Sequence, residues 1–334
     1  MLLSVFCGPG GLDLGFEQAG FEVALALDHN ADNLASYRRN RPETALACEA
    51  DLTRLRLDTL DKLYGSQLNP SGLIGGPPCQ SFSQANQSVE DDDPRHALPL
   101  SMARLAARLN ERRRLPFVVM ENVPDLAGRH SDWLKDATQE LERAGFSVSQ
   151  AILNAADYGV PQNRSRLFVV ALNTSLFGKR CWQPPPRTHV TPKTVRQAIG
   201  KLPEPVIFER GLDPDDIPHH PNHWCMTPKS PKFRKRGALV PGRSSQRSFK
   251  TLHWDKPSLT VAYGHREVHI HPDCHRRLSV FEAMRLQGFP DKYVLEGTLS
   301  SQIEQVSEAV PPPMAEAVAA SVAAIVCKAK NSAR

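Results

Sequence analysis

Near the end of its first quarter the chain reads GGPPCQSFS, from Gly75 to Ser83, and places Cys79 directly behind two glycines and two prolines. Buried cysteines usually lie within apolar runs and pack as small hydrophobic residues. Here the glycines free the backbone and the prolines then restrict it, so the turn can hold one side chain still at a strand end. A rigid, partly ionised thiol is a nucleophile. The alternative is a rigid surface turn with an incidental thiol.

Acidic residues also stand at or just after the ends of predicted strands. They are Asp28, Asp51 and Glu121, and Cys79 follows the strand predicted at 72–76. In doubly wound sheets, ligands bind at the carboxyl ends of the strands. Four reactive groups on one rim are hard to attribute to chance, so we expect them to share a site.

Short apolar runs alternate with helical patterns along the first half of the chain, which is typical of a doubly wound α/β sheet. After Asn173 the chain becomes rich in proline and loses clear periodicity, which predicts a second, smaller and irregular domain. The Ala-rich segment at 311–326 predicts a helix that packs back on the first domain. The predicted strands lie at 2–6, 21–28, 44–51, 72–76, 116–123, 146–154 and 166–173, and the predicted helices at 12–20, 30–40, 97–114 and 131–145.

Composition narrows the class of protein. The 334 residues are 40% hydrophobic, enough for a sizeable core. No run approaches the ~18 apolar residues of a membrane helix, and the start, MLLSVFCGPGG, shows no basic leader, so we expect neither a membrane span nor a signal peptide. The seven cysteines are scattered and form no Cys-x-x-Cys pair. This indicates reduced thiols and argues against a disulfide framework or a structural zinc site.

Charge is unevenly distributed along the chain. The net charge is +5, and no Asp or Glu occurs from Ile217 to Trp254. A long acid-free segment with interspersed Ser, Asn, His and aromatic residues favours a surface that follows phosphates, and therefore a nucleic acid partner. The alternative is a solvated face. The basic residues of the segment are Lys229, Lys232, Arg234, Lys235, Arg236, Arg243, Arg247 and Lys250.

The glycine-rich turn FCGPGGLDLG follows the first predicted strand. Such a turn lets backbone amides approach a ligand at a helix N-terminus, and it would serve NAD, FAD or S-adenosylmethionine equally. Asp28 ends the second predicted strand, where a carboxylate can bind both ribose hydroxyls.

In this order, the motifs FCGPGG, GGPPCQSFS, ENV (121–123), QNRSRLF (162–168), RRLSVFEAMRLQGFPD (276–291) and AVPPPMAEAVA resemble the DNA (cytosine-5-)-methyltransferase family. The resemblance implies a Rossmann-like, S-adenosylmethionine-dependent sheet at 1–178, completed by 292–334, and a target-recognition domain at 179–291. It also implies methyl transfer to carbon 5 of a flipped cytosine in a specific duplex DNA sequence.

That reaction matches the residues. Carbon 5 of cytosine is a poor nucleophile, but addition of the Cys79 thiolate to carbon 6 makes it enamine-like. Attack builds electron density on ring nitrogen 3, which needs an acid. Glu121 fits, as a carboxyl at an apolar strand end with a raised pKa, and Asn122 can orient it. After transfer, the proton on carbon 5 is removed and the thiolate is expelled.

Arg164 and Arg166 alternate with Asn163 and Ser165 ahead of a predicted strand, so they share a face. The alternative is a surface ion-pair strand. The resemblance implies that Arg166 grips the cytosine carbonyl oxygen, whereas Arg164 braces the site and the phosphate.

The resemblance implies S-adenosylmethionine as cofactor and S-adenosylhomocysteine as product. Two departures from the family occur: Ser4 stands where an Asp is frequent, and Ser307-Glu308 replace a usual Gly-Asn. The residues expected around the cofactor are Phe6, Gly8, Gly10, Asp28, His29, Asp51, Pro78 and Glu308.

The target base must leave the duplex to reach Cys79. The polar segment at 81–96 is expected to be a mobile lid or a disordered surface loop. HIHPDCH (269–275) is expected to be a strand and turn, and no metal is expected. The residues expected to contact DNA are Gln80, Ser83, Lys232, Arg234, Lys235, Arg236 and Arg243.

The resulting hypothesis is a monomeric enzyme in the cytoplasm of a bacterial or phage-infected cell. It acts on double-stranded DNA, with a restriction endonuclease as a possible partner that the sequence does not reveal. Two alternatives stay open: a tRNA cytosine 5-methyltransferase of the same family, and a catalytically idle relative that binds DNA as a regulator.

Overall fold

The computed structural model describes residues 1–41, 46–78, 97–128, 131–243, 249–260 and 269–332. Contacts divide the chain into two units. The first unit comprises Met1–Leu153, Ser165–Pro186 and Ala315–Arg334, and the second comprises Asn154–Arg164 and Arg187–Met314. The sequence places 154–164 and 292–314 in the first domain, whereas these segments make most of their contacts within the second unit. The boundaries given above separate a catalytic domain from a target-recognition domain, and this functional division stays a prediction.

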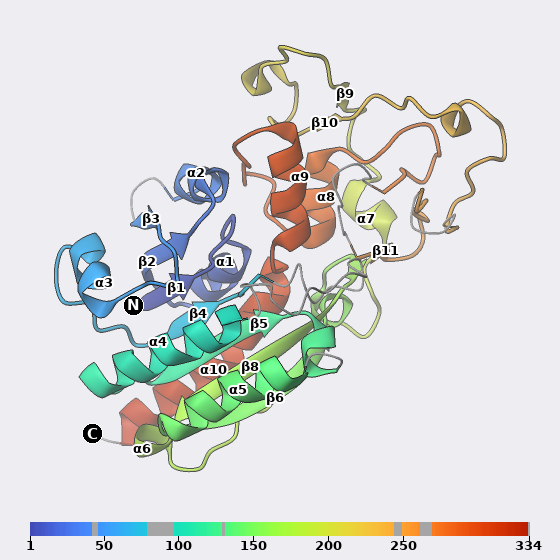
Figure 1. Ribbon diagram of the computed structural model, residues 1–334. Helices are drawn as coiled ribbons and strands as arrows, with labels where there is room; N and C mark the ends of the chain where they lie inside the picture. Colours follow the sequence, from blue (N-terminus) through green and yellow to red (C-terminus); the bar gives the residue numbers. More distant parts are fainter. Residues whose placement is uncertain (42–45, 79–96, 129–130, 244–248, 261–268, 333–334) are drawn as a thin grey trace. The chain divides into compact units, whose positions relative to one another are not determined.

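A seven-stranded sheet organises the first unit, with the strand order β3-β2-β1-β4-β5-β8-β6 (Figure 1). Neighbouring strands from β3 to β5 are parallel, and β8 runs antiparallel to β5. The strands are β1 (Leu2–Val5), β2 (Val23–Asp28), β3 (Ala47–Glu49), β4 (Leu73–Gly75), β5 (Phe117–Asn122), β6 (Phe146–Asn154) and β8 (Ser165–Asn173). The predicted doubly wound α/β sheet is therefore confirmed.

Helices cover both faces of this sheet. Leucine, methionine and alanine recur at helical spacing in α4, at Met102, Leu105, Ala106 and Leu109, and this stripe packs on the strands. Figure 1 shows α4 and α5 over one face and α10 behind the other. The helices are α1 (Gly11–Gln18), α2 (Ala31–Arg39), α3 (Leu57–Tyr64), α4 (Leu98–Arg112), α5 (Ser131–Arg143), α6 (Thr174–Phe177) and α10 (Pro312–Ser332).

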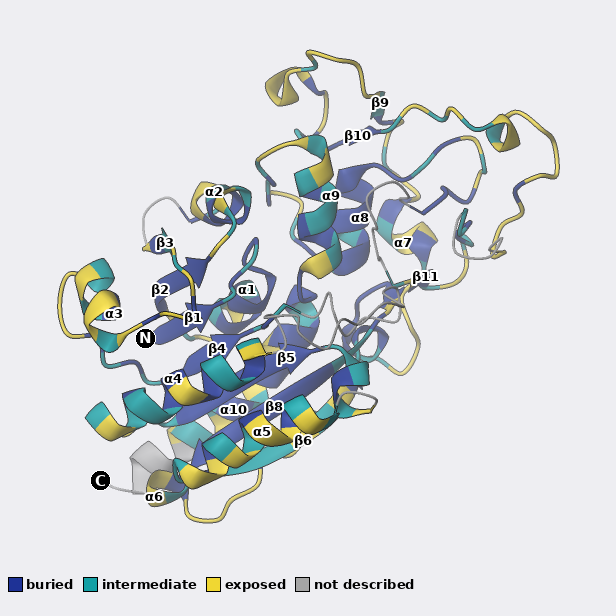
Figure 2. Cartoon of the chain, in the orientation of Figure 1, coloured by how far each residue is buried: buried dark blue, intermediate teal, exposed yellow. Residues whose placement is uncertain are grey.

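The strand order reverses between β1 and β4, because β2 and β3 lie on one side of β1, and β4 and β5 on the other. The crevice at such a reversal is where open α/β sheets bind their ligands. Figure 2 shows β1 and β4, the two strands at the reversal, buried throughout. The loop after β1 and the loop after β4 both leave the sheet there.

The second unit has short elements, as the irregular composition predicts. Its strands are two residues long: β7 (Gln162–Asn163) pairs with β11 (Ser258–Leu259), and β9 (Val206–Ile207) with β10 (Trp224–Cys225). Val195, Ile199, Leu252, Leu278 and Leu286 form a small core. Its helices are α7 (Val195–Ile199), α8 (Val280–Gln287) and α9 (Leu299–Glu308), with short 3₁₀ turns that include η5 (Pro231–Phe233).

Within the described residues, one stretch, Leu299–Cys327, is long and apolar enough to pass a membrane-span test, with a mean hydropathy of 1.5. It is two helices, α9 and α10, with a break before Pro312. Met314, Val318 and Val322 of α10 are fully buried. Core helices of folded proteins pass the same test, and we interpret α10 as one.

Candidate active site

Asn122 fixes the backbone that leads to Cys79. The ends of β4 and β5 lie side by side, with Gly75 opposite Met120. Asn122 is 2% exposed, and its Nδ2 donates to the carbonyl oxygen of Pro77 at 3.1 Å. The predicted role of Asn122, to orient Glu121, stays a prediction.

The segment that follows Pro78 in sequence contains three predicted site residues. Cys79, Gln80 and Ser83 lie outside the described residues, and so does the segment predicted as a lid. Their roles stay predictions. What the structure adds is that Asn122, at the end of β5, holds the backbone of Pro77, two residues before Cys79.

Glu121 and Arg166 form a nearly buried ion pair across two antiparallel strands. Arg166 Nε lies 3.0 Å from Glu121 Oε1, and the two side chains are 12% and 9% exposed. Arg166 Nη1 also donates to the carbonyl oxygen of Ser165 at 2.8 Å. An arginine held in this way orients the carboxyl group, and both groups keep some surface for a substrate.

Gly75 is needed for close packing, and Gly76 lies close to the Glu121 carboxyl, which sequence reasoning missed. A Cβ on Gly75 would lie 2.5 Å from the carbonyl oxygen of Val5, and one on Gly76 would lie 3.1 Å from Glu121 Oε2. The sequence suggested only that the glycines free the backbone. Two successive glycines at the end of a central strand are also a signal of close approach.

Arg164 is fully buried, unlike a residue of a surface ion-pair strand. In the second unit its Nη2 donates to the carbonyl oxygen of Ser307 at 2.7 Å. The guanidinium therefore supports the backbone at the departure Ser307-Glu308. Its predicted contact with a phosphate stays a prediction.

The loop after β1 has the backbone of a ligand cradle. Phe6, Gly8 and Gly10 have φ values of 54°, 55° and 92°, in the left-handed region that favours glycine. Apart from Gly8 itself and its two chain neighbours, no heavy atom of the described residues lies within 4 Å of a Cβ built on Gly8. The loop thus borders open space next to the N-terminus of α1, which fits a ligand held by backbone groups.

Asp28 is 4% exposed and holds this loop. Its Oδ2 accepts the N–H of Gly8 at 2.8 Å, and its Oδ1 accepts from Asn30 N at 2.9 Å and Asn33 Nδ2 at 3.1 Å. The carboxylate is therefore already a structural group. Contact of Asp28 with a ribose stays a prediction.

The other predicted cofactor residues are more exposed. His29 Nδ1 lies 3.6 Å from Asp28 Oδ1. Asp51 Oδ1 accepts from Thr53 N and Oγ1, and these hydrogen bonds lower the pKa of Asp51. Pro78 is half-buried after β4, and Glu308 is exposed at the end of α9 in the second unit.

Lys232, Arg234, Lys235, Arg236 and Arg243, predicted to bind DNA, are all exposed in the second unit. Lys232 Nζ lies 4.2 Å from the ring centroid of Phe249, which packs 6.1 Å from the ring of Phe233. An aromatic pair thus supports part of this basic surface.

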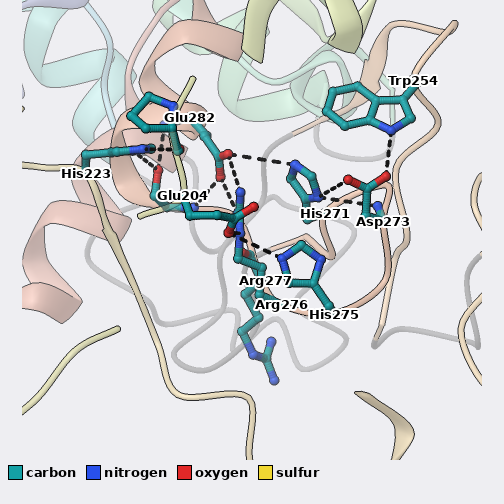
Figure 3. Close-up of polar contacts among 11 residues, drawn as sticks. Glu204, His223, Trp254, His271, Asp273, His275, Arg276, Arg277 and Glu282 are labelled. Atoms are coloured by element: carbon teal, nitrogen blue, oxygen red, sulfur yellow. Dashed lines mark hydrogen bonds and ion pairs between the residues drawn. The ribbon is translucent and has the colours of Figure 1, made fainter. Parts of the chain in front are cut away.

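A cluster of charged groups lies ahead of α8 (Figure 3). Arg276 binds Glu282 through two nitrogens, at 2.8 and 2.9 Å, and Glu204 through Nε at 2.6 Å. Both Arg276 and Glu282 are buried. Glu282 also accepts the backbone N–H of Ser279 in a capping box, so the cluster fixes the start of α8.

His271, Asp273 and His275 each place one possible metal ligand within 4.8 Å of the others. Other groups already engage these side chains. Trp254 donates to Asp273 at 2.8 Å, His271 Nδ1 accepts from the backbone of Asp273 at 3.3 Å, and His275 Nε2 lies 3.3 Å from Glu204. We therefore keep the prediction of a turn without metal.

Residues 1–324 match the family described as C-5 cytosine-specific DNA methylase. The chain is 35% identical over 333 residues to the Type II methyltransferase M1.HphI of Haemophilus parahaemolyticus, covering 96% of this chain and 86% of that protein. It is 32% identical over 343 residues to the Type II methyltransferase M.MthTI of Methanothermobacter thermautotrophicus, covering 95% of each.

Solved structures show the same fold. A prophage-encoded protein of E. coli, assigned as a DNA modification methyltransferase, superposes with a TM-score of 0.80 at 23% identity, over 98% of this chain and 99% of that one. The S. pombe Dnmt2 methyltransferase superposes with a TM-score of 0.66 at 16% identity, over 98% of each chain.

Proposed function

Because the chain belongs to the C-5 cytosine-specific DNA methylase family and is a DNA (cytosine-5-)-methyltransferase, we propose that it acts through a covalent bond between Cys79 and carbon 6 of a flipped cytosine. The observation that supports this mechanism best is the arrangement at the ends of β4 and β5. Asn122 holds the carbonyl of Pro77, two residues before Cys79, and Glu121 lies beside it with Arg166.

Three residues of the chain then have separate roles in the reaction. The Cys79 thiolate adds to carbon 6, and Glu121 gives ring nitrogen 3 a proton as electron density builds there. Arg166 holds the Glu121 carboxyl through Nε, and we expect the same guanidinium to bind the carbonyl oxygen of the base. When a base later removes the proton from carbon 5, the electron pair of that bond reforms the ring double bond and expels the thiolate.

Family membership implies S-adenosylmethionine as the methyl donor. When bound, it supplies an electrophilic methyl group on a sulfonium. The residues expected to hold it are Phe6, Gly8 and Gly10 of the loop after β1, then Asp28, His29, Asp51 and Pro78 of the same unit, and Glu308 of the second unit. The open space beside Gly8 and the left-handed backbone fit such a ligand.

The substrate would be double-stranded DNA with a specific sequence, bound through the basic surface of the second unit. The curated relatives are named Type II methyltransferases, so we expect a restriction endonuclease of the same specificity as partner. We further expect a monomer that acts in the cytoplasm. The likeness to the S. pombe Dnmt2 methyltransferase is at 16% identity and concerns the fold alone.

A transfer assay tests this function. Purified wild-type chain and Cys79→Ala receive radiolabelled S-adenosylmethionine with duplex DNA and tRNA in parallel reactions. We expect label only in DNA and only with the wild-type chain, and bisulfite sequencing of the product would give the target sequence. Equal labelling of tRNA, or label in DNA with Cys79→Ala, would contradict the proposal.

A further inference from the structure

A buried polar cluster adjoins the glycine-rich loop, and the mechanism above does not use it. Ser4 of β1, Asp13 of α1 and Tyr37 of α2 are 0% exposed. The Ser4 hydroxyl donates to Asp13 Oδ1 and the Tyr37 hydroxyl to Asp13 Oδ2, each at 2.7 Å. One carboxylate is thus held from two elements. Burial raises the pKa of Asp13 to about 6, against the opposing effects of Arg41 and the two hydroxyls.

Arg41 connects this cluster to the loop, and it is 8% exposed. Its guanidinium lies 4.2 Å from the ring centroid of Tyr37. Its Nε donates to both oxygens of Glu17, at 2.7 and 3.0 Å, and its Nη2 donates to the carbonyl oxygen of Gly10 at 3.2 Å. The aromatic ring and the carboxylate together aim one nitrogen at the backbone of the loop.

Gly10 is the point at which the loop becomes α1. It has a φ of 92°, and its own N–H donates to the carbonyl oxygen of Cys7 at 3.0 Å. Asp28 holds the same loop through the N–H of Gly8. The loop is therefore fixed at one N–H and one carbonyl by side chains that lie outside it in sequence. Because backbone groups of the loop would bind the ligand, these two anchors set the shape of the cradle.

We propose that Arg41 is a positioning residue for the methyl donor: by holding the carbonyl of Gly10, it fixes the loop conformation that binds S-adenosylmethionine. This rests on the proposed function of the loop. Asp13 and Tyr37 act through Arg41, because the hydrogen bond from Tyr37 to Asp13 keeps the ring against the guanidinium. Ser4 of β1 stands where the family frequently has an Asp. In this chain the carboxylate beside that position comes from Asp13 of α1, which accepts the Ser4 hydroxyl.

The test is calorimetric titration of S-adenosylhomocysteine into the full chain. A hydrogen bond from a charged donor contributes about 1.5–3 kcal/mol, so Arg41→Met should raise the Kd roughly ten- to a hundredfold. Arg41→Lys, which keeps one donor and the charge, should restore part of the affinity. The rate of methyl transfer at saturating S-adenosylmethionine should change less than about twofold, because loop shape affects binding before chemistry.

Arg112 provides a matched control in the same unit. Its Nη1 donates to Asp61 Oδ1 at 2.7 Å and to the carbonyl oxygen of Leu68 at 3.3 Å, the same combination of carboxylate and backbone carbonyl. Arg112→Met should lower the Tm and leave the Kd for S-adenosylhomocysteine unchanged. Tyr37→Phe is the second variant, for use if Arg41→Met does not fold. It keeps the ring and removes the donor to Asp13, so we expect a smaller rise in the Kd for S-adenosylhomocysteine.

The outcomes separate the two claims. If the Kd of Arg41→Met is within twofold of the wild-type value, the positioning role alone is overturned. If Arg41→Met does not fold, the same result with Tyr37→Phe overturns it. An equal rise in Arg112→Met would do the same, because the effect would then be general loss of stability. A wild-type chain that binds no S-adenosylhomocysteine would overturn the proposed cofactor, and the positioning role with it.

Discussion

Two buried Arg–Glu pairs serve different purposes in this molecule. In the second unit, Arg276 and Glu282 are 4% and 1% exposed, and two nitrogens of the arginine meet two oxygens of the glutamate. In the first unit, Arg166 and Glu121 are 12% and 9% exposed and meet through Nε. The closed pair fixes the start of a helix. The more open pair lies at a strand end, beside the backbone that leads to Cys79.

The comparison predicts that the two pairs separate activity from stability. A carboxyl that takes part in proton transfer and is partly open should matter for rate. A closed pair should matter for folding, since removing one partner leaves a buried charge. The first two experiments below each place a variant on one side of this division.

Glu121→Gln should give the largest loss of rate. The amide keeps the shape and can still accept from Arg166, but it cannot give a proton to ring nitrogen 3, so single-turnover methylation should fall about 10²–10⁴-fold. Thermal unfolding should change little. A variant with nearly wild-type turnover would remove Glu121 from the chemistry.

Arg276→Met should give the largest loss of stability. It leaves Glu282 buried without its guanidinium, which costs about 3–5 kcal/mol. Urea unfolding should show this loss, and Arg196→Met is a suitable control, because Arg196 binds Asp255 in an exposed pair in the same unit. Exposed pairs contribute about 0–1 kcal/mol. Similar losses in both variants would contradict the distinction between closed and open pairs.

His220 should make the second unit sensitive to acid. Its Nδ1 accepts from Asn222 N at 3.0 Å and its Nε2 faces the carbonyl oxygen of Tyr293 at 3.1 Å, which satisfies the neutral ring. Burial lowers the pKa of His220 to about 4. Because the unfolded chain takes up this proton near pH 6.5, as an unperturbed histidine does, stability should fall as the pH drops from about 6.5 to 4, by up to about 3 kcal/mol.

The measurement is urea unfolding at several pH values for wild type and His220→Gln, in which an amide replaces the ring. The variant should be less stable at neutral pH and should lose less on acidification. Parallel pH dependences in the two chains would show that another group is responsible.

Substitutions in the basic surface should produce the smallest change per residue, measured as the free energy of duplex binding. Replacing Lys232, Arg234, Lys235 and Arg236 with Ala should weaken duplex binding and reduce the slope of log Kd against log salt by about 0.9 for each lost phosphate contact. Binding titrations at four or more salt concentrations give the slope. If it stays the same, these side chains face solvent in the complex, and DNA binds elsewhere.

The sequence was informative where reactive residues stand at the ends of apolar runs. The strands that end near Asp28 and Glu121 were predicted because apolar runs end there, and the structure confirms both strands. The helices α3 and α9 were not predicted. Their apolar stripes are short and cover only one or two turns, so tertiary contacts decide their conformation.

Long-range partners were beyond sequence reasoning. Nothing along the chain indicates that Asn122 binds Pro77, or that Arg164 donates to Ser307, 143 residues away. The antiparallel direction of β8 was equally hidden, because an apolar run has the same pattern in either direction. The same holds for Arg41, which reaches Gly10 from 31 positions along the chain.

The most direct test of the account is covalent trapping on a duplex that carries 5-fluorocytosine at the target site. Fluorine on carbon 5 cannot leave as a proton, so the enzyme should stay bonded to DNA through Cys79 after methyl transfer. We predict a complex that survives denaturing electrophoresis with wild type and with Cys181→Ala, a control at an exposed free thiol, and none with Cys79→Ala. A complex that forms normally with Cys79→Ala would contradict the assignment of the nucleophile.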